Sequence, residues 1–138
     1  MRGTSRIRPA RTSFEHAVNN DPEIVAHFYG RLFADHPELR AYFPRDMAGQ
    51  ERALGEKLTE IMLHLEDPDY LRVHLAALGI RHAVQYRVQP EMYGFVKDAL
   101  VSTLADAVPE WNDELDREWD GALTAVAGMM LAGAENAA

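Results

Sequence analysis

Apolar residues recur along this chain at the three- and four-residue spacing of α-helices. No segment alternates with period two for long enough to predict a strand. The apolar stripes are separated by proline-containing breaks at residues 21–23, 36–37, 67–69, 89–91 and 108–110. Because proline fits the first turn of a helix but disrupts its interior, these breaks mark helix starts and ends. We expect an all-α fold of six to eight helices, with linkers too irregular for a simple four-helix bundle.

The apolar stripes also indicate where the folded domain begins. They cover, in chain order, residues 13–20, 24–33, 39–43, 54–65, 71–82, 93–104 and 115–131. A chain of 138 residues suits one domain, and its 47% of hydrophobic residues is enough for a core, which excludes a disordered chain or a collagen. We therefore predict a single domain over residues 13–138, preceded by a basic, flexible arm over residues 1–12.

Charge and cysteine content narrow the function classes. The arm carries Arg2, Arg6, Arg8 and Arg11 and no acid, whereas the whole chain has a net charge of −8. An acidic body argues against nucleic acid as a partner. No apolar run reaches the roughly 18 residues of a membrane span, and the first residues lack the apolar region of a secretory signal, so we expect a cytoplasmic protein without membrane insertion. The absence of cysteine excludes disulfides, iron–sulfur clusters and thiolate ligands.

Six histidines raise the question of a metal site. Their spacing matches neither the HExxH pattern nor a repeated Glu-x-x-His pattern, so zinc and di-iron sites are not predicted. A single imidazole on a haem needs no second protein ligand, so spacing does not exclude haem. His82 ends the apolar stripe that begins at Leu71. It is either a helix-end histidine that interacts with the dipole of the helix C-terminus, or the single imidazole ligand of a haem. Similarly, Tyr29 and Phe43 could both be plain core aromatics. The alternative for Tyr29 is that its hydroxyl donates a hydrogen bond to a bound diatomic gas.

Four segments, in their order and approximate spacing, resemble the bacterial globins, meaning the single-domain haemoglobins and the globin half of flavohaemoglobins. They are HFYGRLFADHPELRAYF at 27–43, QERAL at 50–54, LGIRHAVQYRVQPEMYGFVKDAL at 78–100 and EWDGAL at 118–123. The resemblance runs from about residue 13 to about residue 135. It implies a globin fold, a three-over-three helical sandwich around a pocket for haem b.

The resemblance implies a role for individual residues. His82 matches the proximal histidine, which is the iron ligand, and Phe43 matches the phenylalanine that packs flat on the haem. Tyr29 matches the distal tyrosine, which donates a hydrogen bond to the bound oxygen. Gln50 matches the distal glutamine, and Leu54, one helical turn later, matches the apolar residue above the iron.

On the proximal side, Tyr93 matches the tyrosine at the start of the next helix. Near these residues the sequence departs from the family pattern in two places. Pro90 lies eight residues after His82 instead of seven, which indicates one extra residue in the loop 83–89. The family's proximal glutamate falls at Ala134, while Glu135 lies one residue further, about 100° around the helix. In the family this glutamate joins the proximal histidine and tyrosine in a triad. If the shift of Glu135 weakens that triad here, the imidazole is less anionic, which favours reversible oxygen carriage over peroxide chemistry.

A haem is a flat apolar disc with two anionic propionates, so it needs an apolar slot between helices and cations at the rim. Each apolar residue of such a slot could equally be plain core. The predicted lining residues are Phe28, Phe43, Leu54, Leu58, Leu78, Val88, Val96 and Met130. The predicted rim cations are Arg81 and Arg45.

The resemblance implies reversible binding of oxygen, or of other diatomics such as nitric oxide and carbon monoxide, for transport or storage, by a monomer or homodimer. The related flavohaemoglobins convert nitric oxide to nitrate with an attached flavin reductase, for which 138 residues leave no room. Nitric oxide dioxygenase activity would need a separate reductase, so the question of enzyme activity stays open. The alternatives are a haem-based gas sensor or signalling module and a haem-free interaction module.

Overall fold

The computed structural model describes residues 7–84 and 86–137, and over these ranges it is all-helical with no strand. This confirms the predicted fold class. The helices are α1 (Ile7–Asn20), α2 (Ile24–Asp35), the short 3₁₀ helix η1 (Pro37–Tyr42), α3 (Ala48–Leu63), α4 (Pro68–Val84), α5 (Pro90–Ala107) and α6 (Asp113–Ala137).

Short polar side chains hold the starts of three helices. The Asp46 carboxylate accepts a hydrogen bond from the Ala48 N–H at 3.0 Å where α3 begins. Asp67 accepts one from the Tyr70 N–H at 3.2 Å in the first turn of α4, and Asn112 accepts one from the Leu115 N–H at 2.8 Å in α6. Because the first N–H groups of a helix have no partner within it, these short polar side chains fix where each helix begins.

Two helix ends differ from the sequence prediction. Helix α1 begins at Ile7 instead of residue 13, so part of the predicted arm is helical, while residues 1–6 lie outside the described chain. Arg11, assigned to the arm, is half-buried, and its Nε donates a hydrogen bond to the Met62 carbonyl at 3.0 Å. The pattern of apolar residues could not predict this hydrogen bond, because Arg11 is a charged residue and not part of an apolar stripe. Helix α4 runs on to Val84, slightly beyond the predicted end of its stripe.

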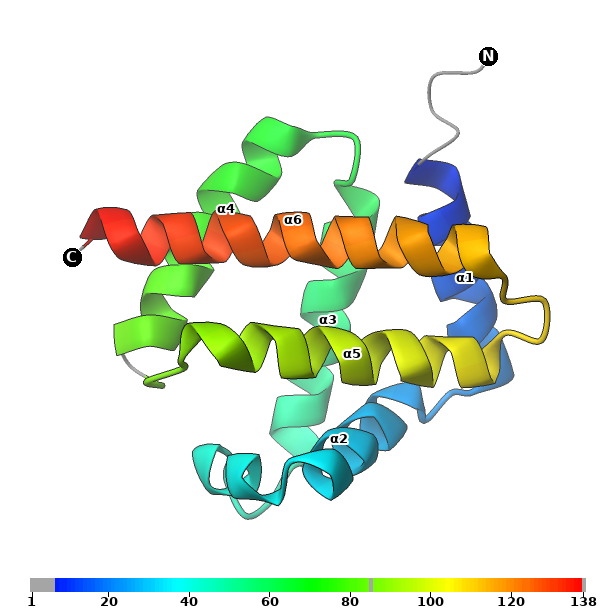
Figure 1. The fold of residues 1–138 in the computed structure, drawn as a ribbon, viewed down its shortest axis with the longest axis horizontal. Coiled ribbons are helices and arrows are strands. Elements are labelled where there is room, and N and C mark those ends of the chain that lie inside the picture. The colour runs from blue at the N-terminus through cyan, green and yellow to red at the C-terminus, as the bar shows by residue number, and fades with distance from the viewer. Residues whose placement is uncertain (1–6, 85, 138) are drawn as a thin grey trace.

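Figure 1 shows α5 and α6 lying side by side, with α4 behind the C-terminal half of α6. Helix α1 packs against both α5 and α6, and α2 packs against α5. Helix α3 packs against α1 and α2, whereas α4 packs extensively against α6. Within the described ranges α3 and α4 are not a packed pair, although they follow one another in the chain. The two helices that carry Gln50 and His82 therefore rest on different neighbours.

Trp119 is fully buried at the centre of the core and is tied to the first helix. Its indole Nε1 donates a hydrogen bond to the buried Ser13 hydroxyl at 2.8 Å, and that hydroxyl donates to the Ala10 carbonyl at 2.9 Å. A buried indole N–H needs such a partner, because an unmet donor costs free energy in the folded state. This pair joins α1 to α6. In the described part of the chain, no helix is long and apolar enough to cross a membrane.

Candidate functional site

Tyr29 of α2 and Gln50 of α3 meet through a hydrogen bond. The Gln50 amide nitrogen donates to the Tyr29 hydroxyl at 3.1 Å. Tyr29 is only 5% exposed, and this burial raises the pKa of its phenol above the ordinary value. The phenol therefore stays protonated at neutral pH, and its own proton is left to donate to a further acceptor. The structure thus brings together the two polar residues that the sequence analysis assigned to the distal side.

Aromatic rings hold the Tyr29 side chain in place. The centroids of Phe28, Phe33 and Phe43 lie 4.9, 5.8 and 5.4 Å from the Tyr29 centroid. Phe33 and Phe43 also contact each other edge to face at 5.3 Å. The contact with Phe28 is tilted, that with Phe33 is stacked and that with Phe43 is edge-on, and such contacts are favourable and leave the ring little freedom. Phe33 was placed on the helical stripe but not in the site, although it lies one turn after Tyr29 and its spacing could have indicated this contact.

Phe43 owes its position to Arg40, which the sequence analysis did not single out. The Arg40 guanidinium donates hydrogen bonds to the carbonyls of Pro44 at 2.9 Å and Arg45 at 3.0 Å. It also lies over the Phe33 ring at 5.4 Å. A guanidinium has five N–H donors in a rigid fork, so one side chain can hold several carbonyls of a corner at once. No sequence pattern marks this role, because the acceptors are backbone atoms.

His82, in the last turn of α4, has one ring nitrogen engaged and one available. Its Nδ1 lies 2.9 Å from the Leu78 carbonyl, and since a carbonyl only accepts, Nδ1 carries the proton. The half-buried position lowers the pKa of His82 below its ordinary value, so the imidazole is neutral at neutral pH. Among the described residues, Nε2 has no hydrogen-bond partner. A neutral imidazole with Nδ1 fixed and Nε2 available is prepared to bind a metal.

The loop after His82 folds back onto the imidazole. The Tyr86 ring contacts the His82 ring edge to face, with centroids 5.6 Å apart and an interplanar angle of 88°. The Val88 N–H donates to the His82 carbonyl at 2.9 Å, and Arg87 adopts a left-handed backbone with φ of 58°. The loop predicted to hold one extra residue thus turns sharply at Arg87. Tyr86 was missed, because an irregular loop offers no periodicity that would show where its side chains lie.

The proximal triad is not assembled in the described part of the chain. Tyr93 is half-buried, and burial raises the pKa of its phenol. Neither Tyr93 nor Glu135 forms a hydrogen bond with His82 there, and Glu135 is exposed on α6. The imidazole instead uses the Leu78 carbonyl, a neutral acceptor.

The predicted lining residues are less covered than the core. Three are buried, four are half-buried, and Val96 is 37% exposed. The buried ones are Phe28, Leu58 and Met130, and the half-buried ones are Phe43, Leu54, Leu78 and Val88. Phe28, Leu54 and Leu58 border one small apolar cavity of about 10 Å³. A larger open hollow of about 560 Å³ lies between α1, α2 and α3, and none of its walls is a predicted site residue.

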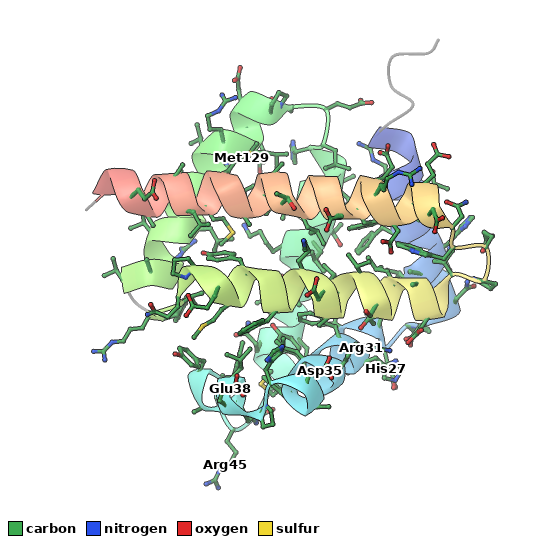
Figure 2. All side chains as sticks on the ribbon, viewed as in Figure 1. His27, Arg31, Asp35, Glu38, Arg45 and Met129 are labelled. Carbon is green, nitrogen blue, oxygen red and sulfur yellow. The ribbon has the colours of Figure 1, made fainter. Side chains whose placement is uncertain are left out.

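Both predicted rim cations are exposed, and Arg45 extends away from the fold (Figure 2). Neither Arg45 nor Arg81 forms an ion pair within the described ranges. The predicted site residues therefore include partly uncovered apolar side chains, an imidazole with an available Nε2, a buried hydroxyl donor and two exposed guanidinium groups. Neither cavity described above is bordered by His82, Tyr29 or Gln50. This set of groups fits a haem, which is a flat apolar disc with an axial position for nitrogen and two anionic propionates.

The described residues thus form an all-helical fold that carries a tyrosine–glutamine pair across α2 and α3 and an imidazole with an available Nε2 on α4. The family model described as Globin matches residues 26–130, and the chain belongs to this family. A Pseudomonas aeruginosa PAO1 protein, described as structurally highly homologous to a human haemoglobin, superposes with a TM-score of 0.80 at 21% identity. The match covers 93% of this chain and 97% of that one, so the fold is the three-over-three globin sandwich.

Two relatives indicate how widely the likeness extends. A flavohemoprotein of Rhizobium meliloti (strain 1021) is 33% identical over 119 residues, which are 82% of this chain and 28% of the relative. Hemoglobin subunit zeta of Sus scrofa is 35% identical over 106 residues, covering 72% of this chain and 75% of the relative. The chain thus spans little more than a quarter of the flavohemoprotein and three quarters of the haemoglobin subunit. Both relatives are haem proteins by name.

Proposed function

We propose that this chain binds haem b through His82, which would ligate the iron, and that it reversibly binds a diatomic gas, oxygen or nitric oxide. The observation that supports this most directly is the state of His82. Its Nδ1 proton is held by the Leu78 carbonyl at 2.9 Å, burial keeps the ring neutral, and Nε2 is available. A dedicated ligand needs all three, whereas a histidine that only caps a helix end needs neither a neutral ring nor a second available nitrogen.

Haem, when bound, supplies an iron centre to which a diatomic gas can bind. Tyr29 supplies the hydrogen-bond donor for that gas. Its hydroxyl accepts from Gln50 at 3.1 Å, so the phenol proton is directed elsewhere. A charge-assisted hydrogen bond of this kind is worth about 1.5–3 kcal/mol. The surrounding phenylalanines exclude water and keep the donor in one orientation.

His82 and Leu78 together set the electron donation from the proximal side. A carbonyl partner leaves the imidazole neutral, whereas a carboxylate partner would give it anionic character. Since Nδ1 is hydrogen-bonded to the Leu78 carbonyl and Glu135 is exposed, electron donation from His82 to a bound iron is modest. This favours reversible gas binding over peroxide chemistry. We place the protein in the cytoplasm as a monomer or homodimer, serving oxygen transport or storage.

Conversion of nitric oxide to nitrate is a second candidate activity, favoured by the 33% identity with a flavohemoprotein. The 138 residues hold one globin unit, so electrons for such a cycle would come from a reductase outside them. Nitric oxide consumption measured with an added reductase, compared with simple oxygen binding, separates the enzyme from the carrier. A gas sensor would show neither turnover nor a role in oxygen supply.

The test is an absorption spectrum after reconstitution with haem. We expect a Soret band in the wild type and loss of axial imidazole ligation in His82→Ala. His74→Ala is the matched control, because His74 lies on the same helix and its Nδ1 also pairs with the carbonyl four residues earlier, Tyr70, at 2.9 Å. Absence of a Soret band in the wild type, or an unchanged ferrous spectrum in His82→Ala, would exclude the proposal.

A further inference from the structure

Helices α4 and α6 cross so closely that two glycines leave no room for a side chain. A Cβ atom added to Gly79 would lie 2.5 Å from the Met130 carbonyl carbon and closer still to its oxygen. A Cβ added to Gly133 would lie 2.5 Å from both the Cα and the carbonyl oxygen of Ala76. Real Cβ contacts essentially never fall below 3.0 Å. In both places the obstacle is backbone, so only a shift of one helix against the other could relieve it.

Other helical glycines of this chain stand in open space. A Cβ added to Gly94 in α5 or to Gly128 in α6 would meet nothing within 4 Å. Glycine in a helix interior is unfavourable relative to alanine because it loses more backbone entropy on folding. At Gly79 and Gly133 only glycine fits between the two helices, whereas alanine would fit at Gly94 and Gly128. The crossing also determines where α4 lies, since α6 is the helix against which α4 packs extensively.

The turn of α4 that rests on α6 is the turn that holds His82. Gly79 precedes His82 by three residues, and the neighbouring Leu78 carbonyl accepts the His82 Nδ1 proton at 2.9 Å. Met130, on the other side of the crossing, is buried and lies on the same helix as the fully buried Trp119. The backbone contact of Gly79 thus ties the turn that holds His82 to the buried Met130 segment of α6.

We propose that Gly79 and Gly133 are positioning residues, which set the place and orientation of the His82 imidazole by fixing α4 against α6. This inference rests on the proposed function, because it concerns the ligation of haem by His82. Both glycines are buried in the crossing, so the role is assigned to the crossing and not to a contact with haem. A side chain at residue 79 moves α4 relative to α6, carries the Leu78 carbonyl with it, and changes how Nε2 meets the iron.

The experiment compares four single variants of the full chain, Gly79→Ala and Gly133→Ala against the controls Gly94→Ala and Gly128→Ala. Each is measured as apoprotein by urea unfolding and, with haem, by the ferrous iron–histidine stretching band and the rate of haem loss. We expect a shifted band and about tenfold or faster haem loss in Gly79→Ala. Gly133→Ala should shift the band less, since Gly133 faces Ala76, six residues before His82. The controls should match the wild type in the band and in haem loss, and they should be at least as stable in urea, because alanine is favoured over glycine in a helix.

A second pair of variants separates positioning of the imidazole from general damage to the pocket. His82→Gly with added free imidazole detaches the ligand from α4. With the ligand detached, the band should be the same whether or not Gly79→Ala is also present. A shift that persists with free imidazole would overturn the inference. If Gly79→Ala does not fold, Gly133→Ala with the same His82→Gly comparison provides the test.

Failure of the inference is distinct from failure of the proposed function. If the wild type does not ligate haem through His82, both are overturned, and the Soret band reports this before any glycine is changed. If the wild type ligates haem normally but the band and haem loss of Gly79→Ala match those of Gly128→Ala, only the positioning role is overturned. Lower urea resistance of Gly79→Ala alone, without a band shift, shows a purely structural crossing and also overturns the inference.

Discussion

The Gln50 side-chain amide donates a hydrogen bond to the Tyr29 hydroxyl at 3.1 Å, joining α3 to α2. The direction of this bond matters, because an amide N–H can only donate and the phenol must accept. The Tyr29 proton is therefore free for another acceptor, which on the proposed function is the bound gas. Gln50 then acts on the gas through Tyr29.

Replacing Tyr29 with phenylalanine removes the donor and keeps the ring. We expect the oxygen dissociation rate constant to rise by about one to two decades, the equivalent of a charge-assisted hydrogen bond of about 1.5–3 kcal/mol. Stopped-flow mixing or laser photolysis measures this rate. Tyr42→Phe is the control, because Tyr42 is 41% exposed. Equal rates in the wild type and Tyr29→Phe would exclude Tyr29 as the donor.

Replacing Gln50 with leucine removes the bond that orients the Tyr29 hydroxyl. We expect faster oxygen dissociation, by less than in Tyr29→Phe, because the phenol proton remains but is no longer directed. In the double variant the two effects should not add, since residues in one hydrogen-bond network are coupled. Additive effects would mean that Gln50 acts on the gas independently of Tyr29.

Burial lowers the pKa of His82, which makes apoprotein stability depend on pH. Below the ordinary value of 6.5 the unfolded chain binds a proton at this residue that the folded chain does not. The contribution of neutral His82 is therefore complete above that value and is lost as pH falls toward the folded pKa. Urea unfolding at about pH 7.5 and about pH 5 should show a smaller loss of stability in His82→Gln than in the wild type. An identical loss in both proteins would contradict this.

His27 should show the opposite pH dependence. Its Nδ1 lies 2.6 Å from the Asp21 carboxylate, and this bond and charge raise the pKa of His27. Its stabilising effect is complete below the ordinary value of 6.5 and is lost as pH rises through the raised folded pKa. Figure 2 shows His27 on the exposed side of α2, so His27→Gln changes no core contact. The stability difference from the wild type should be larger at about pH 5.5 than at about pH 8.5, and a larger difference at the higher pH would contradict the prediction.

The Trp119–Ser13 pair should contribute strongly to stability. Ser13→Ala leaves the buried indole N–H without its acceptor at 2.8 Å, and we expect a loss of about 1–3 kcal/mol in the free energy of unfolding. Trp111 is the matched residue, because its indole N–H donates to Asp116 at 3.2 Å near the surface. Removing that acceptor in Asp116→Ala should cost less than Ser13→Ala in urea unfolding. The reverse order would show that the α1–α6 connection does not depend on this bond.

The sequence predicts those parts of the molecule that depend on local spacing. Apolar stripes and proline breaks indicate the helices, because each helix buries one face and begins at a cap. The placement of both Tyr29 and Gln50 on the distal side follows from the resemblance, whereas the hydrogen bond between them was not predicted. The contributions of Arg40, Tyr86 and Gly79 were not predicted, because each depends on backbone atoms or rings that tertiary packing brings together. Gly79 alone in a helical stripe indicates only a weaker helix, and its steric role is evident only from the position of the Met130 backbone.

The separate packing of α3 and α4 has a consequence for the lifetime of the protein in a cell. Helix α3 rests on α1 and α2, and α4 rests on α6, so a haem held between α3 and α4 would join two helices that are not otherwise a packed pair within the described ranges. A ligand that binds only the folded state adds its binding free energy to stability. The haem-free protein would then open more often and be degraded faster. On the proposed function, the cellular amount of this protein would follow the supply of haem even without transcriptional control.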